Sequence, residues 1–121
     1  MLYAITRDGD LRGVTNVPRA EVFEELRGRL TEVQFESIRD EISRRIEGMD
    51  RFVSSYIGAV DWTGTPLEDI SDVACPGNHD LAAQFFGLMV WYHMMEHPDA
   101  WSFQVYEDEG GTNYFRINVP E

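Results

Sequence analysis

Two histidines and a glutamate, His93, Glu96 and His97, form the segment of the sequence most able to do chemistry. On a helix, residues four positions apart project from the same face, so the two imidazoles could bind one Zn²⁺ ion. Glu96 could then act on a metal-bound water, and Glu107 or Glu109 could supply a third ligand. The alternative is that His93 packs among aromatic side chains while Glu96 and His97 lie in an exposed last turn, where a histidine suits the helix dipole.

The same segment resembles motifs of two enzyme families. Its H-x-x-E-H spacing resembles the inverted zinc-protease motif, in which a downstream carboxylate completes the metal site. The stretch from Glu96 to Trp101 resembles the E-H-H-P-E-W stretch of pterin carbinolamine dehydratases, whose histidines act on the bound pterin. That resemblance implies a role for His97 alone, because the second histidine of the motif is missing here.

Cys75 and His79 form a second candidate for nucleophilic chemistry. Both lie where a loop enters a helix, a position where backbone N–H groups can lower the pKa of a thiol, and Asp80 could orient the imidazole. The alternative is a structural cysteine in the core, since free cysteine is among the most buried residue types. The sequence favours this alternative, because the two side chains would have to meet across a turn.

The acidic residues are distributed unevenly along the chain. Residues 1–60 contain 11 acidic residues and nine arginines, whereas residues 61–121 contain 11 acidic residues and one arginine. Such asymmetry indicates an interaction surface, and carboxylates beside aromatic side chains suit docking on a basic protein. The predicted contact residues are Asp99, Trp101, Tyr106, Glu107, Asp108 and Glu109.

Three hypotheses about function follow. The leading one is a non-catalytic acidic protein, comparable to an inhibitor, an immunity protein or an antitoxin, that docks its second half on a basic protein partner and needs no cofactor. The second is a small metal- or ligand-binding enzyme with a pocket between sheet and helices and zinc as its metal. The third is that the acidity is an adaptation of the host. The formal net charge of −12 repels phosphate backbones, so conventional nucleic-acid binding is excluded.

Strand signals near both ends of the chain predict two hairpins. Residues 2–6 and 11–15 flank an Asp-Gly turn, which is a strong hairpin signal. Residues 101–106 alternate apolar and polar, and a Gly-Gly turn leads from them to residues 114–119. On the last strand, the residues expected on the inward face are Phe115, Ile117 and Val119.

Helical patterns fill the chain between the hairpins. A helix should begin near Pro18, and a short one should span residues 65–73. A capping box at Thr31 opens a stripe of apolar residues that reaches Tyr56, which predicts one continuous helix. The helix over residues 79–96 is apolar on nearly all sides, so it must be central or lie at a subunit contact. In a homodimer, the contact residues would be Leu88, Met89, Trp91 and Tyr92.

These elements predict one α+β domain over residues 1–121. An antiparallel sheet of about four strands, made of the two hairpins, should carry three to four helices on one face as a two-layer structure. We expect no membrane association, because the longest apolar stretch, residues 81–95, is shorter than the roughly 20 residues that a spanning helix needs. A single cysteine and a charged amino terminus favour a cytoplasmic location.

Overall fold

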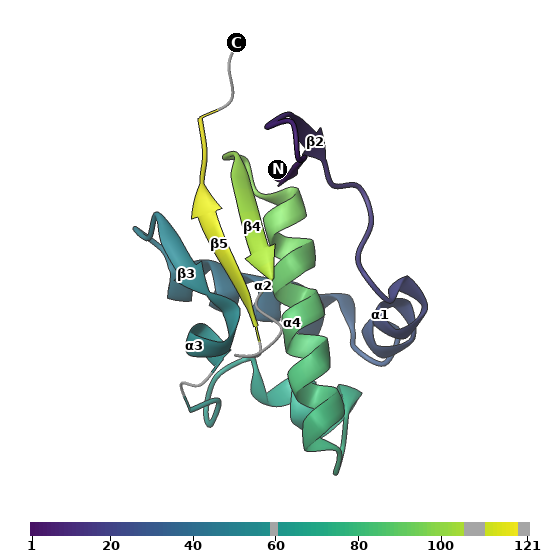
Figure 1. The fold of residues 1–121 in the computed structure, drawn as a ribbon. Helices are drawn as coiled ribbons and strands as arrows, with labels where there is room; N and C mark the ends of the chain where they lie inside the picture. Colours follow the sequence, from purple (N-terminus) through teal and green to yellow (C-terminus); the bar gives the residue numbers. More distant parts are fainter. Residues whose placement is uncertain (59–60, 106–110, 119–121) are drawn as a thin grey trace.

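One five-stranded sheet forms the framework of the fold in the computed structural model, which describes residues 1–58, 61–105 and 111–118 (Figure 1). The strand order is β2-β1-β4-β5-β3. The predicted α+β class is therefore confirmed. The strands are β1 (Leu2–Ile5), β2 (Leu11–Gly13), β3 (Arg51–Val53), β4 (Trp101–Val105) and β5 (Thr112–Arg116).

Both predicted hairpins are present, but they are joined in an unexpected way. β1 pairs with β2 and β4 pairs with β5, each antiparallel. β1 also pairs with β4 in parallel, with Leu2 opposite Trp101. The sheet is therefore mixed, which corrects the prediction of an antiparallel sheet of about four strands.

The fifth strand comes from a segment that was predicted to be helical. Helix α2 (Glu32–Ile46) ends early, Gly48 adopts a left-handed conformation with φ of +77°, and β3 then pairs with β5. Phe52 is buried there and stacks on Tyr114, with 5.1 Å between the ring centroids. The prediction of one helix from Thr31 to Tyr56 is therefore wrong, because a glycine turn and sheet pairing end the helix. A short helix, α3 (Ser54–Gly58), follows β3.

Side-chain caps mark the starts of α2 and α4. Thr31 forms the expected capping box with Gln34 at the start of α2. Asn78 caps α4 (His79–Glu96) by accepting a hydrogen bond from the Leu81 N–H at 3.0 Å. With α1 (Ala20–Arg27) and a π-helical turn, η1 (Ile70–Ala74), the described part of the chain has five helical segments instead of three to four.

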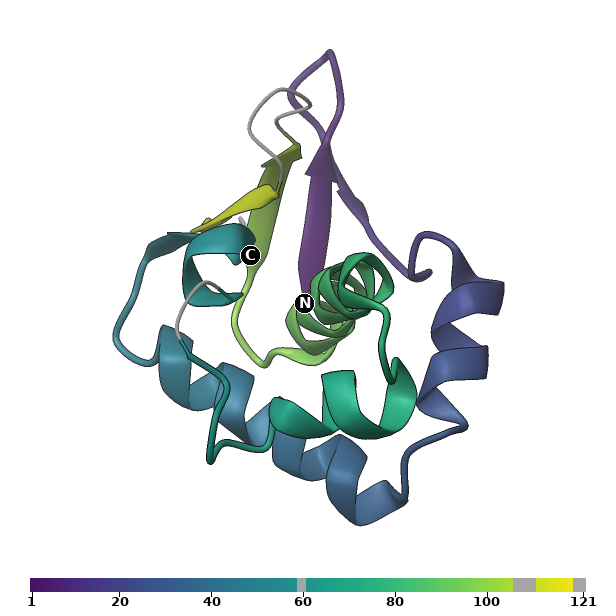
Figure 2. The ribbon, with the colours of Figure 1, turned by 90° about the horizontal axis from the view of Figure 1, so that it is seen from below.

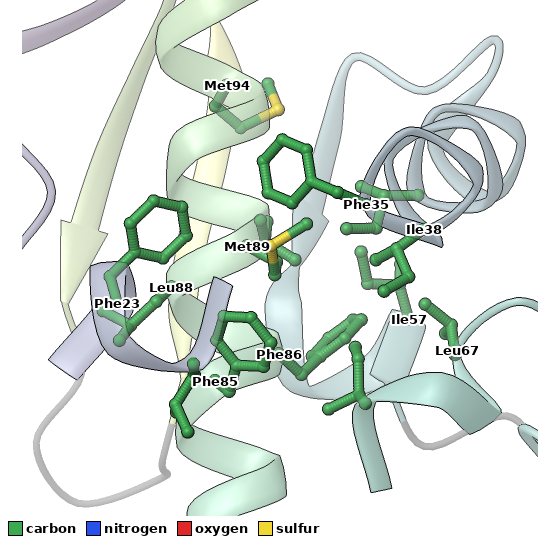
Figure 3. Close-up of a cluster of buried hydrophobic side chains, with 14 of the residues drawn as sticks. Phe23, Phe35, Ile38, Ile57, Leu67, Phe85, Phe86, Leu88, Met89 and Met94 are labelled. Atoms are coloured by element: carbon green, nitrogen blue, oxygen red, sulfur yellow. The ribbon is translucent and has the colours of Figure 1, made fainter. Parts of the chain in front are cut away.

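Helix α4 lies at the centre of the molecule. Figure 2 shows it between the sheet on one side and α2 on the other. Phe23 of α1 packs against Phe85 of α4, and Phe35 of α2 and Ile57 of α3 belong to the same buried cluster around α4 (Figure 3). The predicted central position of α4 is thus confirmed, and the layers are a sheet, α4, and the helices beyond it. Within the described residues, no helix is long and apolar enough to cross a membrane.

The inward face of β5 differs from the predicted one. Tyr114 points towards α4 and is buried, with its ring 6.5 Å from that of Trp91. Phe115 is half-buried on the opposite face, and Val119 lies outside the described residues. Because side chains alternate along a strand, an error of one residue in register exchanges the two faces.

Candidate functional site

The predicted metal-binding residues lie at the C-terminal end of α4. The rings of His93 and His97 are 6.1 Å apart and perpendicular, and Glu96 is exposed. Nδ1 of His97 accepts a hydrogen bond from the backbone N–H of Asp99 at 3.0 Å. The described residues contain no group of three or more histidine, cysteine or acidic side chains that could hold a metal ion. Glu107 and Glu109 lie outside them, so the zinc site stays a prediction.

His93 is a core residue, as the alternative interpretation predicted. Its side chain lies among the buried residues at 9% exposure. Burial, together with the positive charge of Arg39 and the neighbouring His97, lowers the pKa of His93 to about 4. The imidazole is therefore neutral at physiological pH.

The predicted docking residues are only partly described by the structure. Asp99 accepts a hydrogen bond from Nη1 of Arg116 at 2.5 Å, and this bond lowers the pKa of the Asp99 carboxyl. Trp101 is 0% exposed, and the Arg116 guanidinium lies 4.6 Å from its ring centroid. The prediction of Trp101 as a docking contact is therefore wrong, because its side chain is buried at the point where β4 pairs with both β1 and β5. The other predicted contact residues, Tyr106, Glu107, Asp108 and Glu109, lie outside the described residues.

Arginines from the first half of the sequence reach into the acidic second half. Nη1 of Arg29 donates to the carbonyl of Ala74 at 2.7 Å. Arg45 donates to the carbonyl of Asp61 at 3.4 Å and also pairs with Glu41. Positive charge therefore lies beside part of the acidic sequence, at residues 61–74.

Cys75 is buried, as the sequence favoured. Burial raises the pKa of the Cys75 thiol, and nearby Arg29 offsets this only in part. A nucleophilic cysteine requires the opposite shift. His79, the proposed partner, is exposed at the start of α4.

A cleft opens beside the middle of α4, away from His93 and His97. It has a volume of about 760 Å³. One face of α4 forms its floor, because positions three and four apart along a helix share a face. The floor residues are Ala83, Gln84, Gly87, Leu88 and Trp91. We call this space the α4 cleft.

Three other parts of the chain form the walls of the α4 cleft. Pro18 and Arg19, before α1, form the first part, and α3 with Trp62 after it forms the second. The ends of the β4–β5 hairpin form the third, and α3 and these strand ends lie together beside α4 (Figure 1). The remaining lining residues are Ser54, Ser55, Gly58, Phe86, Val105, Gly111 and Thr112.

Glycines determine how closely the walls approach and how open the floor is. A Cβ atom on Gly58 would lie 2.6 Å from the ring of Phe86. A glycine at position 58 therefore lets α3 approach α4 more closely than a residue with a side chain would. Gly111 adopts φ of +122°, and a Cβ there would lie 2.9 Å from Oγ of Ser55. At Gly87, by contrast, a Cβ would meet nothing within 4 Å, because that position faces the open cleft.

Two tryptophans give the cleft its apolar surface. Nε1 of Trp62 donates to the Gly58 carbonyl at 3.0 Å, and Nε1 of Trp91 donates to the Asn16 carbonyl at 3.1 Å. Both indole N–H groups are thus satisfied within the chain. The rings offer apolar contact to an occupant of the cleft.

Sequence reasoning missed the α4 cleft. Two of the residues predicted for a dimer contact, Leu88 and Trp91, line this cleft, and the homodimer itself stays a prediction. The available signal was the combination of Gly87 and Gln84 within the apolar interior of the helix, residues 81–92. The walls were beyond reach, because they come from segments far apart in the sequence.

Comparisons with protein-family models, with curated proteins and with solved structures gave no match to this chain. The site must therefore be interpreted from its own geometry.

Proposed function

We propose that this protein binds a small, largely apolar organic molecule in the α4 cleft. The observation that carries the proposal is the cleft itself, with a volume of about 760 Å³ and a lining that includes Trp62, Phe86 and Trp91. Sites for small molecules typically enclose roughly 300 to 1,000 Å³ and have mainly apolar walls with a few polar groups. The α4 cleft agrees with that description in size and in chemistry.

The lining favours a flat ligand, such as an aromatic ring system. Trp62 packs on Phe86 with 5.6 Å between ring centroids, and Trp91 packs on Phe103 with 4.6 Å between them. Their indole N–H groups are already bonded, so their contribution is ring contact and not hydrogen bonding. Aromatic pairs contribute about 0.5 to 1.5 kcal/mol beyond the burial of their area.

The polar lining groups favour binding over acid–base chemistry. They are the guanidinium of Arg19, the amide of Gln84 and the hydroxyls of two serines and a threonine. Such groups orient a ligand through hydrogen bonds.

The acidic docking surface and the zinc site remain predictions. Docking of the acidic second half on a basic partner depends on residues 106–109, outside the described ranges, and on Asp99, which is paired with Arg116. Pull-downs at low and at high salt test the docking hypothesis. We expect basic partner proteins at low salt and their loss at high salt. Metal analysis of the purified protein tests the zinc site at His93, Glu96 and His97.

Titration with a neutral fluorescent probe, N-phenyl-1-naphthylamine, tests the proposed function. We expect saturable binding to one site, with enhanced probe fluorescence. Gly87→Trp should abolish it, because the new side chain would fill the cleft from its floor. Val33→Trp is the matched control, since Val33 is exposed and lies outside the cleft.

Two results would contradict the proposal. One is binding that Gly87→Trp leaves unchanged in a folded protein, and the other is an absence of saturable binding. Light scattering on the same samples identifies another occupant, because a dimer that Gly87→Trp dissociates would mean that a second copy fills the cleft.

A further inference from the structure

The α4 cleft contains one charged side chain among its described lining residues, the guanidinium of Arg19. From its placement we infer that the ligand of the cleft is a small organic acid, whose carboxylate binds Arg19 while its apolar part lies against Trp91. This inference rests on the proposed function and adds the chemical class of the ligand.

The charge of Arg19 is available to a ligand. The side chain is exposed, and no carboxylate of the described residues lies within ion-pair distance of it. By contrast, Arg116 of β5 pairs with both Asp50 and Asp99. A cation at the rim of an apolar cleft provides the charge complementarity that an anionic group requires.

Gln84 holds the guanidinium above the floor of the cleft. Nη1 of Arg19 donates to Oε1 of Gln84 at 3.0 Å, across 65 positions of sequence. A guanidinium has five N–H donors, so this bond leaves donors for a ligand. The contact also fixes the orientation of the planar group, which reduces the entropy lost when a ligand binds.

The backbone of Arg19 is strained. It has φ of +51° and ψ of +49°, and within the described residues it is the one residue other than glycine with positive φ. Such a conformation costs about 1 kcal/mol or more, and it is cheaper for glycine or asparagine. An arginine at this position is explained if its guanidinium is needed beside the cleft.

The single cation favours a carboxylate over a more highly charged group. A guanidinium binds the two oxygens of a planar carboxylate through parallel N–H···O bonds. A phosphate dianion would leave one negative charge uncompensated in a protein whose formal net charge is already −12. An aromatic or cyclic monocarboxylic acid therefore fits the charge and the walls of the cleft.

Matched naphthalene ligands test this inference at pH 7.5. The probes are 2-naphthoate and its neutral isostere 2-naphthamide, measured by calorimetry and by displacement of N-phenyl-1-naphthylamine. We expect the protein to bind 2-naphthoate about tenfold or more tightly than 2-naphthamide, as a charge-assisted hydrogen-bond pair implies. In Arg19→Asn, which keeps a residue suited to the left-handed conformation, this ratio should fall to about one.

Two further variants keep the test informative. Arg7→Asn removes the same charge from an exposed turn outside the cleft and should leave the ratio unchanged. Gln84→Leu leaves the backbone at Arg19 untouched and should lower the ratio several-fold, because the guanidinium loses its positioning contact. This variant serves if Arg19→Asn does not fold.

The outcomes separate the inference from the proposed function. Equal affinity for the two naphthalene ligands, or an unchanged ratio in folded Arg19→Asn, would overturn the carboxylate inference. Binding of the neutral probe in the same experiment would still support the proposed function of the α4 cleft. If neither naphthalene ligand nor the neutral probe binds, both proposals fail.

Discussion

Buried polar atoms without hydrogen-bond partners gather near the C-terminal end of α4. Within the described residues, they include both ring nitrogens of His93, Nε of Arg39 and Nε1 of Trp101. The rings of His93 and His97, and those of His97 and Trp101, lie about 6 Å apart. An unsatisfied buried polar group costs roughly 1 to 3 kcal/mol. This end of the helix is therefore less stable than its apolar packing alone would make it.

Acid should destabilise the fold through His93. The pKa of His93 in the folded chain is about 4, below the ordinary 6.5, so the unfolded chain binds more protons between these two values. The contribution of neutral His93 to the free energy of unfolding should be fully present above pH 6.5. It should be lost as the pH decreases towards 4, by up to about 3 kcal/mol. His97, whose pKa is also lowered by burial, acts in the same direction.

Urea denaturation at pH 7.5 and pH 5.0 measures this effect. His93→Leu should remove most of the difference between the two pH values, because it removes the group that takes up the proton. His79→Gln is the control, since His79 is exposed. An equal loss of stability in His93→Leu and in the unaltered protein would show that other groups are responsible.

At the scale of elements, apolar spacing predicted some boundaries and missed others. The capping box at Thr31 is a local hydrogen-bond pattern, so the sequence was sufficient to locate the start of α2. The prediction of one continuous helix from the apolar stripe between Phe35 and Tyr56 failed, because helical spacing of apolar residues does not exclude a turn and an edge strand within the same segment. Tyr56, on the stripe, is exposed, whereas Phe52, off the stripe, is buried.

Two glycines in different backbone conformations should respond oppositely to alanine. Gly48→Ala should destabilise the protein by about 1 kcal/mol, because its φ of +77° in the turn after α2 disfavours any residue with a Cβ. Gly87→Ala should stabilise it by roughly 0.5 to 1 kcal/mol, because Gly87 lies inside α4 and has open space beside it.

Chemical denaturation of both glycine variants provides the measurement. Changes of the same sign would mean either that Gly48 lacks a left-handed conformation or that Gly87 lacks open space beside it. Gly87→Ala also serves the binding experiment, since it narrows the cleft by one methyl group only.

At the scale of the whole molecule, the parallel pairing of β1 with β4 joins the two hairpins into one sheet. It brings Leu2 opposite Trp101, and both side chains are 0% exposed. Each hairpin was predictable from its own turn signal, but nothing local specifies which strands of two hairpins will pair. The α4 cleft was unpredictable for the same reason, because its walls meet only in the folded chain.

Truncation of Leu2 tests the importance of this junction. Leu2→Ala should cost about 2 to 5 kcal/mol, the range for a buried leucine in a packed core. Val33→Ala, at a position with 76% exposure on α2, should change stability by less than about 0.5 kcal/mol. A loss below about 1 kcal/mol for Leu2→Ala would indicate that the first hairpin is only loosely attached.

Because α4 is central, hydrogen exchange of its backbone amides can report on both global unfolding and ligand binding. Because it contacts the sheet and the surrounding helices alike, its middle amide protons should exchange with solvent deuterium only when the entire fold opens. The same helix forms the floor of the cleft, so an occupant should slow that exchange in proportion to its affinity. Mass-spectrometric deuterium uptake over residues 83–91 would then follow folding and ligand capture in a single peptide.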